Sequence, residues 1–138
     1  MAKQTSLLEK TFVADQVLSS AGVCVVMSGV NEGNVTLPSG ALATKFVGVA
    51  QEAVQSGSRS KAIAVQVAGV AQIQSDGSAV IQAGDYVAIA NNSGQVKSVT
   101  PASGTNVRQI VGVALTAATN AAGLLVDVLL QPMVYIGA

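Results

Sequence analysis

Short apolar runs separated by turn-forming residues limit what this chain can fold into. Val, Ile and Thr, which favour a pleated and half-buried backbone, fill these runs, and clusters of Gly, Asn, Asp and Ser interrupt them at short intervals. In residues 61–67, Ile63, Val65 and Val67 alternate with smaller or polar side chains, so that one face of the strand is apolar. The pattern predicts an all-β fold, a compact antiparallel β-barrel or sandwich with short hairpins and an N-terminal arm.

The positions of the turn-forming residues also predict where the individual strands and turns lie. Strands are expected at residues 12–18, 22–27, 46–50, 61–67, 70–74, 86–90, 95–100, 107–115 and 124–130. The loop of residues 91–94 joins two of these strands as a β-hairpin. Asp76 and Asp85 stand beside glycines and are expected to form turns. Pro132 cannot donate a backbone hydrogen bond, so it is expected to end the last strand.

The two ends of the chain stand outside this strand pattern. Residues 1–10 are predicted to form an N-terminal arm, ahead of a single β domain at residues 11–138 that closes with a C-terminal tail at residues 131–138. Ser6 and Glu9 could form a helix capping box, but the helix after it would be very short. An arm that is mobile or ordered only by a partner is preferred.

The apolar residues at the two ends are the candidate binding residues of this chain. They are expected to contact another chain, and they are Leu7, Leu8, Phe12, Met133, Tyr135 and Ile136. Composition supports such a contact, because the chain is 50% apolar with only 10% charged residues, where a typical domain has roughly 25%. Part of its surface is therefore expected to be covered by other chains. A monomer coated with Ser, Thr and Gln remains the alternative.

The residue inventory excludes several kinds of catalytic site. The 138 residues include no His and one Cys, so the chain cannot build a Ser-His-Asp triad, a Cys-His pair or a His/Cys metal site. Cys24 lies in an apolar run and is expected to be a buried structural thiol. Asp127, between Val126 and Val128, is expected on the solvent face or paired across an interface. No catalytic, cofactor-binding or metal site is predicted.

The inventory also argues against several kinds of partner. Seven basic and seven acidic residues give no net charge. The chain therefore lacks the excess of basic residues that attracts nucleic acid. No glycine-rich phosphate loop is present, and no small-molecule substrate is predicted. Residues 1–10 lack the apolar core of a secretory signal, so none is expected, and no apolar stretch is long enough to span a membrane. It is expected to be made and folded in a cytoplasm.

One sequence motif occurs twice. Residues 47–50 (Val-Gly-Val-Ala) recur at residues 111–114, and residues 65–67 resemble residues 126–128. Glycine inside a strand usually marks a bulge or a close approach of another backbone. The two copies fit two halves of one barrel or two hairpins packed together. Chance similarity in a chain rich in Val, Ala and Gly is the alternative.

The order of several short motifs resembles that of the small capsid decoration, or cement, proteins of tailed bacteriophages, a family often mislabelled as phage recombinases. The motifs are residues 46–50, 82–87, 93–96, 110–115 and 124–128. The resemblance implies a β-barrel-like domain that binds the outer surface of a phage head as a homotrimer, against the major capsid protein. It implies a virion protein, made in the host cytoplasm, that stabilises the shell against the pressure of packaged DNA. The arm and tail would then meet another copy or the shell.

Two other functions are weighed against this one. A β-sandwich module of a virion or cell-surface protein could recognise glycan or another partner, but four scattered aromatic residues argue against a glycan cleft. An enzyme, including a strand-exchange recombinase, would need a nucleotide-binding loop and a basic surface for DNA, and the sequence has neither.

Overall fold

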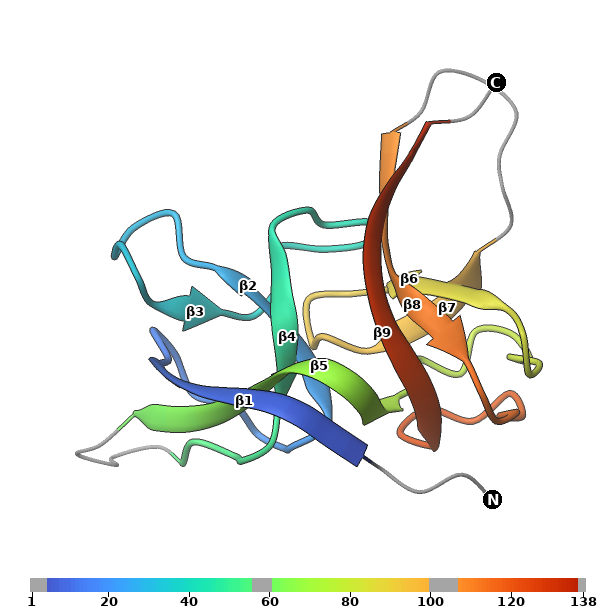
Figure 1. Cartoon of the computed structure of the whole chain (residues 1–138), viewed down its shortest axis with the longest axis horizontal. Helices are drawn as coiled ribbons and strands as arrows, with labels where there is room; N and C mark the ends of the chain where they lie inside the picture. Colours follow the sequence, from blue (N-terminus) through green and yellow to red (C-terminus); the bar gives the residue numbers. More distant parts are fainter. Residues whose placement is uncertain (1–4, 56–60, 100–106, 137–138) are drawn as a thin grey trace.

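Nine β-strands form the secondary structure of residues 5–55, 61–99 and 107–136, the parts of the chain that this computed structural model describes (Figure 1). These residues contain no helix, and the all-β prediction is confirmed. The strands are β1 (Thr5–Val13), β2 (Val23–Met27), β3 (Val35–Thr36), β4 (Phe46–Ala50), β5 (Ala62–Gln74), β6 (Tyr86–Ile89), β7 (Val96–Val99), β8 (Val107–Ala114) and β9 (Leu125–Ile136).

All nine strands belong to one antiparallel sheet that curls into a half-barrel. The order of the strands is β3-β2-β4-β5-β9-β8-β6-β7, and β1 pairs with β5 beside this path. The order is symmetric about its centre: β3-β2-β4-β5 on one side corresponds to β7-β6-β8-β9 on the other. The long strand β5 takes part in both sides, since its first part pairs with β1 and β4 and its last part pairs with β9.

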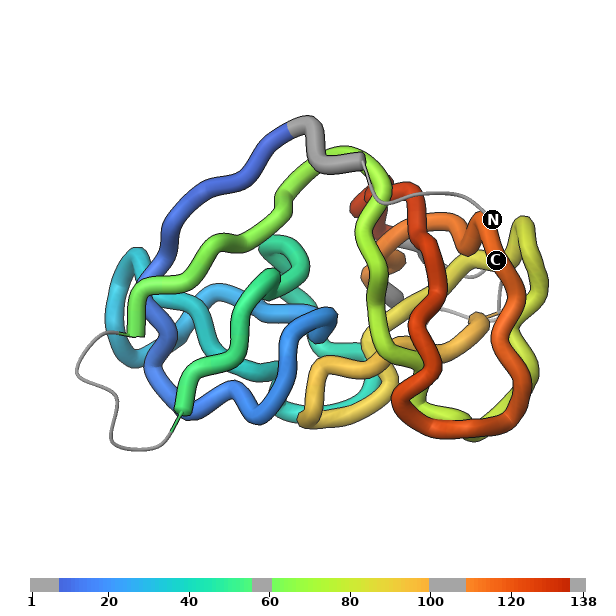
Figure 2. Tube along the Cα trace, turned by 90° about the horizontal axis from the view of Figure 1, so that it is seen from below, coloured from blue at the N-terminus to red at the C-terminus, as the bar shows by residue number. Residues whose placement is uncertain are grey.

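The molecule therefore consists of two similar halves that share β5. We call the first half β1 to β4 with residues 62–66 of β5, and the second half residues 70–74 of β5 with β6 to β9. The two halves form separate lobes in Figure 2, with the blue and cyan chain in one, the yellow to red chain in the other, and β5 passing from one to the other. The last part of β5 pairs with β9 in the second half as β1 pairs with the first part of β5 in the first half, so these two segments correspond.

Pairing outside the named strands repeats in the same way. Each half has one antiparallel and one parallel bridge, at positions 61 to 64 residues apart. The antiparallel bridges join Leu18 to Val54 and Ile81 to Ala118, and the parallel bridges join Ala14 to Val35 and Ser75 to Val96. Agreement at this level shows that the sequence repeat reflects a repeat of the structure.

The strand register confirms the first part of the sequence repeat and corrects the second. The Val-Gly-Val-Ala motifs lie in β4 and β8, and each strand pairs with the long strand next to it. Ala50 pairs with Val65, and Ala114 pairs with Val128. Val65 therefore corresponds to Val128, whereas the sequence match places Val126 there. The difference is two residues, which leaves the side chains on the same strand face.

The predicted strands at residues 22–27, 46–50, 86–90, 95–100 and 107–115 are found, and their ends differ by at most a residue or two. The predicted hairpin is β6 and β7, with Ile89 paired to Val96. The strands predicted at residues 61–67 and 70–74 form one continuous strand, β5. The prediction for residues 12–18 is wrong, because β1 ends at Val13. The two-residue strand β3 was not predicted.

The prediction that Pro132 ends the last strand is wrong. Strand β9 continues to Ile136 and stays paired with β8. Ile110 pairs with Met133 and Gly112 pairs with Leu130, so the register shifts between these pairs. Pro132 lies in the resulting irregularity, and a bulge is one of the places in a sheet where the missing amide hydrogen is tolerated.

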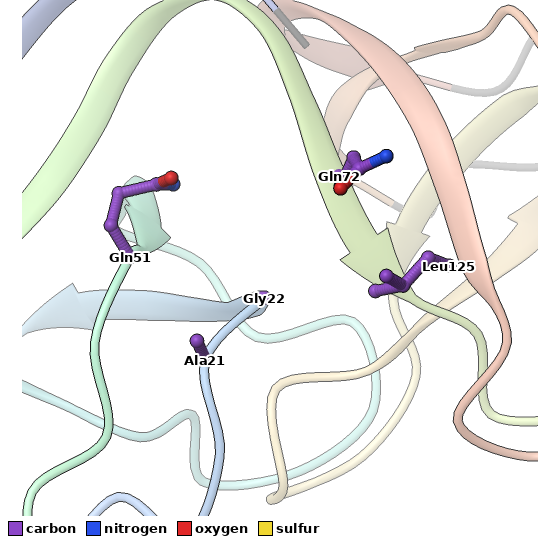
Figure 3. A pocket seen from close by; sticks show the side chains of 5 residues that line it. All are labelled: Ala21, Gly22, Gln51, Gln72 and Leu125. Carbon is purple, nitrogen blue, oxygen red and sulfur yellow. The ribbon is translucent and has the colours of Figure 1, made fainter. Parts of the chain in front are cut away.

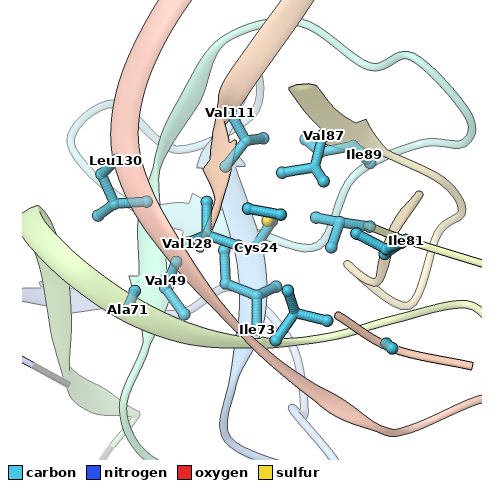
Figure 4. Close-up of a cluster of buried hydrophobic side chains, with 14 of the residues drawn as sticks. Cys24, Val49, Ala71, Ile73, Ile81, Val87, Ile89, Val111, Val128 and Leu130 are labelled. Atoms are coloured by element: carbon cyan, nitrogen blue, oxygen red, sulfur yellow. The ribbon is translucent and has the colours of Figure 1, made fainter. Parts of the chain in front are cut away.

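Two main hydrophobic clusters fill the two halves. The cluster of the first half is built around Leu18, Val25, Val35, Ile63 and Val65. The larger cluster of the second half includes the corresponding residues Ile81, Val87, Val96, Val126 and Val128. It also takes in residues of the first half, so the two halves are packed against each other by apolar side chains (Figure 4).

Candidate interaction surface

The described residues offer no constellation for catalysis. No group of three or more His, Cys, Asp or Glu residues within them could hold a metal ion. The carboxylate of Asp76 accepts hydrogen bonds from the amide and hydroxyl of Ser78. The carboxylate of Asp85 accepts from the amide of Gln82 at 2.9 Å and from the hydroxyl of Ser98 at 3.0 Å. Both side chains hold turns, as predicted.

Cys24 is a core residue, as predicted. It lies in β2 with no exposed surface and belongs to the larger hydrophobic cluster. Burial raises the pKa of its thiol well above the ordinary value, so the reactive thiolate is disfavoured. The backbone amide of Cys24 donates a hydrogen bond of 2.8 Å to the carbonyl of Gly94. This bond ties the β6–β7 loop of the second half to the first half.

The expected solvent-facing position of Asp127 is wrong. Its residue surface is only 3% exposed, and one carboxylate oxygen, Oδ2, has no hydrogen-bond partner among the described residues. The expected alternation along the strand is confirmed, since Val126 and Val128 point into the core and Asp127 points the other way. On that other face, Asp127 lies opposite Gln72 of the neighbouring strand β5 and between Leu125 and Leu129 of its own strand β9. The face is therefore covered at this position.

A polar network orders the loop of residues 28–34. The carboxylate of Asp15 accepts hydrogen bonds from Ser28 Oγ and from the side-chain amides of Asn31 at 3.0 Å and Asn34 at 2.8 Å. These bonds, that from Ser28 above all, lower the pKa of Asp15 below its usual value of 3.8. The loop holds Val30, which is 89% exposed.

The junction of the two halves contains a small cavity (Figure 3). It has a volume of about 170 Å³ and is lined by Ala21, Gly22, Gln51, Gln72 and Leu125. Binding sites for drug-sized ligands usually have volumes of roughly 300–1,000 Å³. No charged side chain lines this cavity, so it offers neither the size nor the chemistry of a substrate pocket.

The N-terminal candidate residues lie on or near an edge strand. The expectation that the arm is ordered only against another chain does not hold for residues 5–10, because β1 pairs with β5 within the single chain. In β1, Leu8 is 56% exposed, whereas Phe12 is partly buried against the cluster of the first half. The side chain of Leu7 lies outside the described part of the structure.

The C-terminal candidate residues lie at the end of β9. Met133 is 37% exposed and the next residue, Val134, is 64% exposed. Successive residues of a strand point to opposite faces, so this part of β9 is exposed on both faces. It forms a two-stranded ribbon with the start of β8, which projects at the top of Figure 1. The side chains of Tyr135 and Ile136 lie outside the described part. The two groups of candidates lie on strands that do not pair with each other.

An apolar row on the outer face of the second half was not predicted from the sequence. Tyr86 pairs with Val113, which pairs with Leu129, which pairs with Val70, so the four side chains lie side by side across four strands. Tyr86 is 42% exposed and the other three are partly exposed. The signal was present in the sequence, because Tyr86 alternates with the core residue Val87 and must face the other way.

The described residues contain no helix that is long and apolar enough to cross a membrane. The exposed apolar side chains of Leu8, Met133 and Val134 on strand edges offer surfaces that other chains can contact. A sequence model of the phage cement proteins matches residues 10–130, and the chain belongs to that family. No curated protein matches the chain. As a phage cement protein it is a non-enzymatic structural protein that decorates the phage capsid.

Proposed function

We propose that this protein binds the outer surface of a phage head as a homotrimer, contacts the major capsid protein and holds the shell against the pressure of packaged DNA. The observation that carries the proposal is the family match over residues 10–130. The protein would be made in the host cytoplasm and added to the outside of the capsid.

Exposed apolar residues at the two chain ends support this proposal. Leu8 on β1 and Met133 and Val134 on β9 are exposed, and these strands have one edge without a partner strand along part of their length in the described part of the chain. Such edges accept further strands or apolar side chains from another protein. The contacts with other copies or the shell are proposed to involve Leu7, Leu8, Phe12, Met133, Tyr135 and Ile136.

A trimer would strengthen binding to the shell by multivalency. Each copy can make a modest contact, but three linked copies engage several capsid subunits at once, so the trimer dissociates only when all contacts are lost together. The chain carries no net charge and few charged residues, which limits repulsion between copies brought close together on the shell.

The test is to add the purified protein to expanded, DNA-filled heads that lack it. The expected result is saturable binding, cryo-electron microscopy density at three-fold and quasi-three-fold positions outside the shell, and less DNA release on heating. The variant Met133→Asp, which places a charge on the exposed ribbon, should bind less, and Val80→Asp, at a 48% exposed site away from the chain ends, should bind normally. Absence of density outside the shell would overturn the proposal.

A further inference from the structure

The two halves bury an apolar contact between them. Cys24 of β2 and Val49 of β4 are paired neighbours on the outer face of the first half, pointing away from that half's own cluster. Both are completely buried, because they belong to one cluster with Ile73, Val111 and Leu130 of the second half (Figure 4). The outer sheet face of the first half thus covers Ile73, Val111 and Leu130, which lie at one end of the core of the second half. We call this end of a half's core its open core end.

The repeat produces a second copy of that outer face. Tyr86 pairs with Val113 in the second half as Cys24 pairs with Val49 in the first. At these two positions the second copy is only partly covered, since Tyr86 is 42% exposed and Val113 is half-buried. Within the described residues, nothing covers Tyr86 and Val113 as the second half covers Cys24 and Val49. Further along the same face, Ala88 is buried in a small cluster against which Leu42 of the first half packs.

The repeat also produces a second copy of the open core end. The corresponding residues of the first and second halves are Phe12 and Ile73, Val47 and Val111, and Val67 and Leu130. In the second half these side chains are between 0% and 8% exposed. In the first half all three are only partly buried against their cluster. Each chain therefore carries one partly uncovered surface of each of the two kinds that fit together inside it.

We propose that a second copy of this chain occupies the outer face around Tyr86 and Val113, with its own Phe12, Val47 and Val67 placed against them. The contact inside the chain is the template: the same two kinds of surface meet, this time from different copies. Because each copy contributes one surface of each kind, the contact is head-to-tail, and such contacts close into a ring when the rotation between copies allows it.

One difference between the halves makes the contact between copies weaker than the contact within the chain. In the first half β3 ends at Thr36, two residues before Pro38, which leaves the amide of Cys24 free to bond the carbonyl of Gly94. In the second half β7 is longer, and Val99 pairs with Tyr86. The backbone bond cannot be repeated there, so the contact between copies relies on apolar side chains.

The inference rests on the homotrimer of the proposed function and names its interface. Three copies joined in this way would place six similar halves around the ring, alternating contacts within and between chains. The contact is a property of the isolated protein, so it can be tested without the capsid.

The test uses single-cysteine variants and a short maleimide cross-linker. Cys24 is buried and does not compete for the reagent. The Tyr86→Cys and Phe12→Cys proteins should each give little covalent dimer alone and a strong dimer when mixed, because the two residues meet only between different copies. Val67→Cys, closer in size to the native residue, replaces Phe12→Cys if the latter folds poorly. Val80→Cys mixed with Phe12→Cys is the control and should stay monomeric on a denaturing gel.

Light scattering gives the second readout. The Tyr86→Glu protein should shift from trimer to monomer at a concentration at which the native protein is trimeric. Cross-linking of Tyr86→Cys to itself would show a symmetric contact and overturn the inference, and so would the absence of dimer in the mixture. A trimer that lacks the Tyr86–Phe12 cross-link would refute the interface alone, whereas a ring that never binds heads would refute the proposed function alone.

Discussion

Gly48 and Gly112 occupy the same position in the two halves of the fold, each beneath a carbonyl oxygen of the neighbouring long strand. A Cβ atom at Gly48 would collide with the carbonyl of Gln66 in β5, and one at Gly112 would collide with the carbonyl of Leu129 in β9. The register also shifts beside each glycine, but against different neighbours: Val47 is an extra residue of β4 relative to β2, whereas β9 has the extra residue opposite Val111 of β8. In both copies of the Val-Gly-Val-Ala motif the glycine thus leaves room for a carbonyl of the neighbouring long strand.

The variants Gly48→Ala and Gly112→Ala are expected to destabilise the protein by about 1–3 kcal/mol each, the usual cost of forcing a group into a packed site. Urea unfolding followed by circular dichroism measures this. Gly29→Ala is the matched control, because nothing lies within 4 Å of a Cβ built at Gly29. Equal stability of Gly112→Ala and Gly29→Ala would contradict the close approach of the Leu129 carbonyl.

Stability should fall in alkaline solution because of Cys24. Its pKa is raised by burial in the folded protein from 9.0, so its contribution is complete below pH 9.0 and decreases as the pH rises above that value. Urea unfolding of the native protein and Cys24→Ala between about pH 7 and about pH 10.5 isolates this effect from other titrating groups. The stability difference between them should shift in favour of Cys24→Ala as the pH rises. A difference that does not change with pH would count against a buried thiol.

Stability should also fall in acid because of Asp15. Its pKa is lowered in the folded protein from 3.8 by the bonds from Ser28, Asn34 and Asn31, so its contribution is complete above pH 3.8 and is lost as the pH falls through the lowered value. The advantage of the native protein over Asp15→Asn should therefore shrink in acid. Glu52→Gln, at an exposed position, is the control. If Asp15→Asn and the native protein respond identically to acid, the network does not stabilise the fold.

Replacing Asp127 should stabilise the chain. The corresponding residue of the first half is Ala64, since Gln51 N bonds to Ala64 O as Leu115 N bonds to Asp127 O. Asp127→Ala removes a buried oxygen without a partner among the described residues, a group that costs about 1–3 kcal/mol. The free energy of unfolding should rise accordingly in urea.

The matched variant for Asp127→Ala is Asp85→Ala. Asp85 accepts hydrogen bonds from Gln82 and Ser98, so its replacement should lower stability. A loss of stability in Asp127→Ala comparable to that in Asp85→Ala would show that the Asp127 carboxylate makes a favourable contact in the folded chain.

The sequence was sufficient to predict the fold class, most central strands and the turns, because these depend on alternation and on glycine, proline and aspartate. The strands at residues 46–50 and 86–90 needed only local information. The end of β9 was mispredicted because Pro132 was judged alone, whereas the pairing of Met133 with Ile110 keeps the strand in the sheet. Tertiary context overrode a local preference there.

The candidate binding surface was only partly predictable. Leu8 and Met133 were identified from their place at the chain ends, and both are exposed. The exposure of Tyr86 and the burial of Asp127 depend on which sheet face is covered, and that follows from how the two halves pack. The repeat in the sequence indicated two similar halves, but it could not indicate that the two equivalent faces are covered to different extents.

The shared strand β5 has a consequence for how the molecule responds to load. Residues 62–66 belong to the core of one half and residues 70–74 to the core of the other, so neither half can unfold without removing a strand from its neighbour. The protein is therefore expected to lose structure in a single cooperative step despite its two cores. A force applied to one lobe is transmitted to the other through the backbone of β5. If both lobes are attached to a shell under tension, the two lobes are therefore not expected to separate at the junction between them.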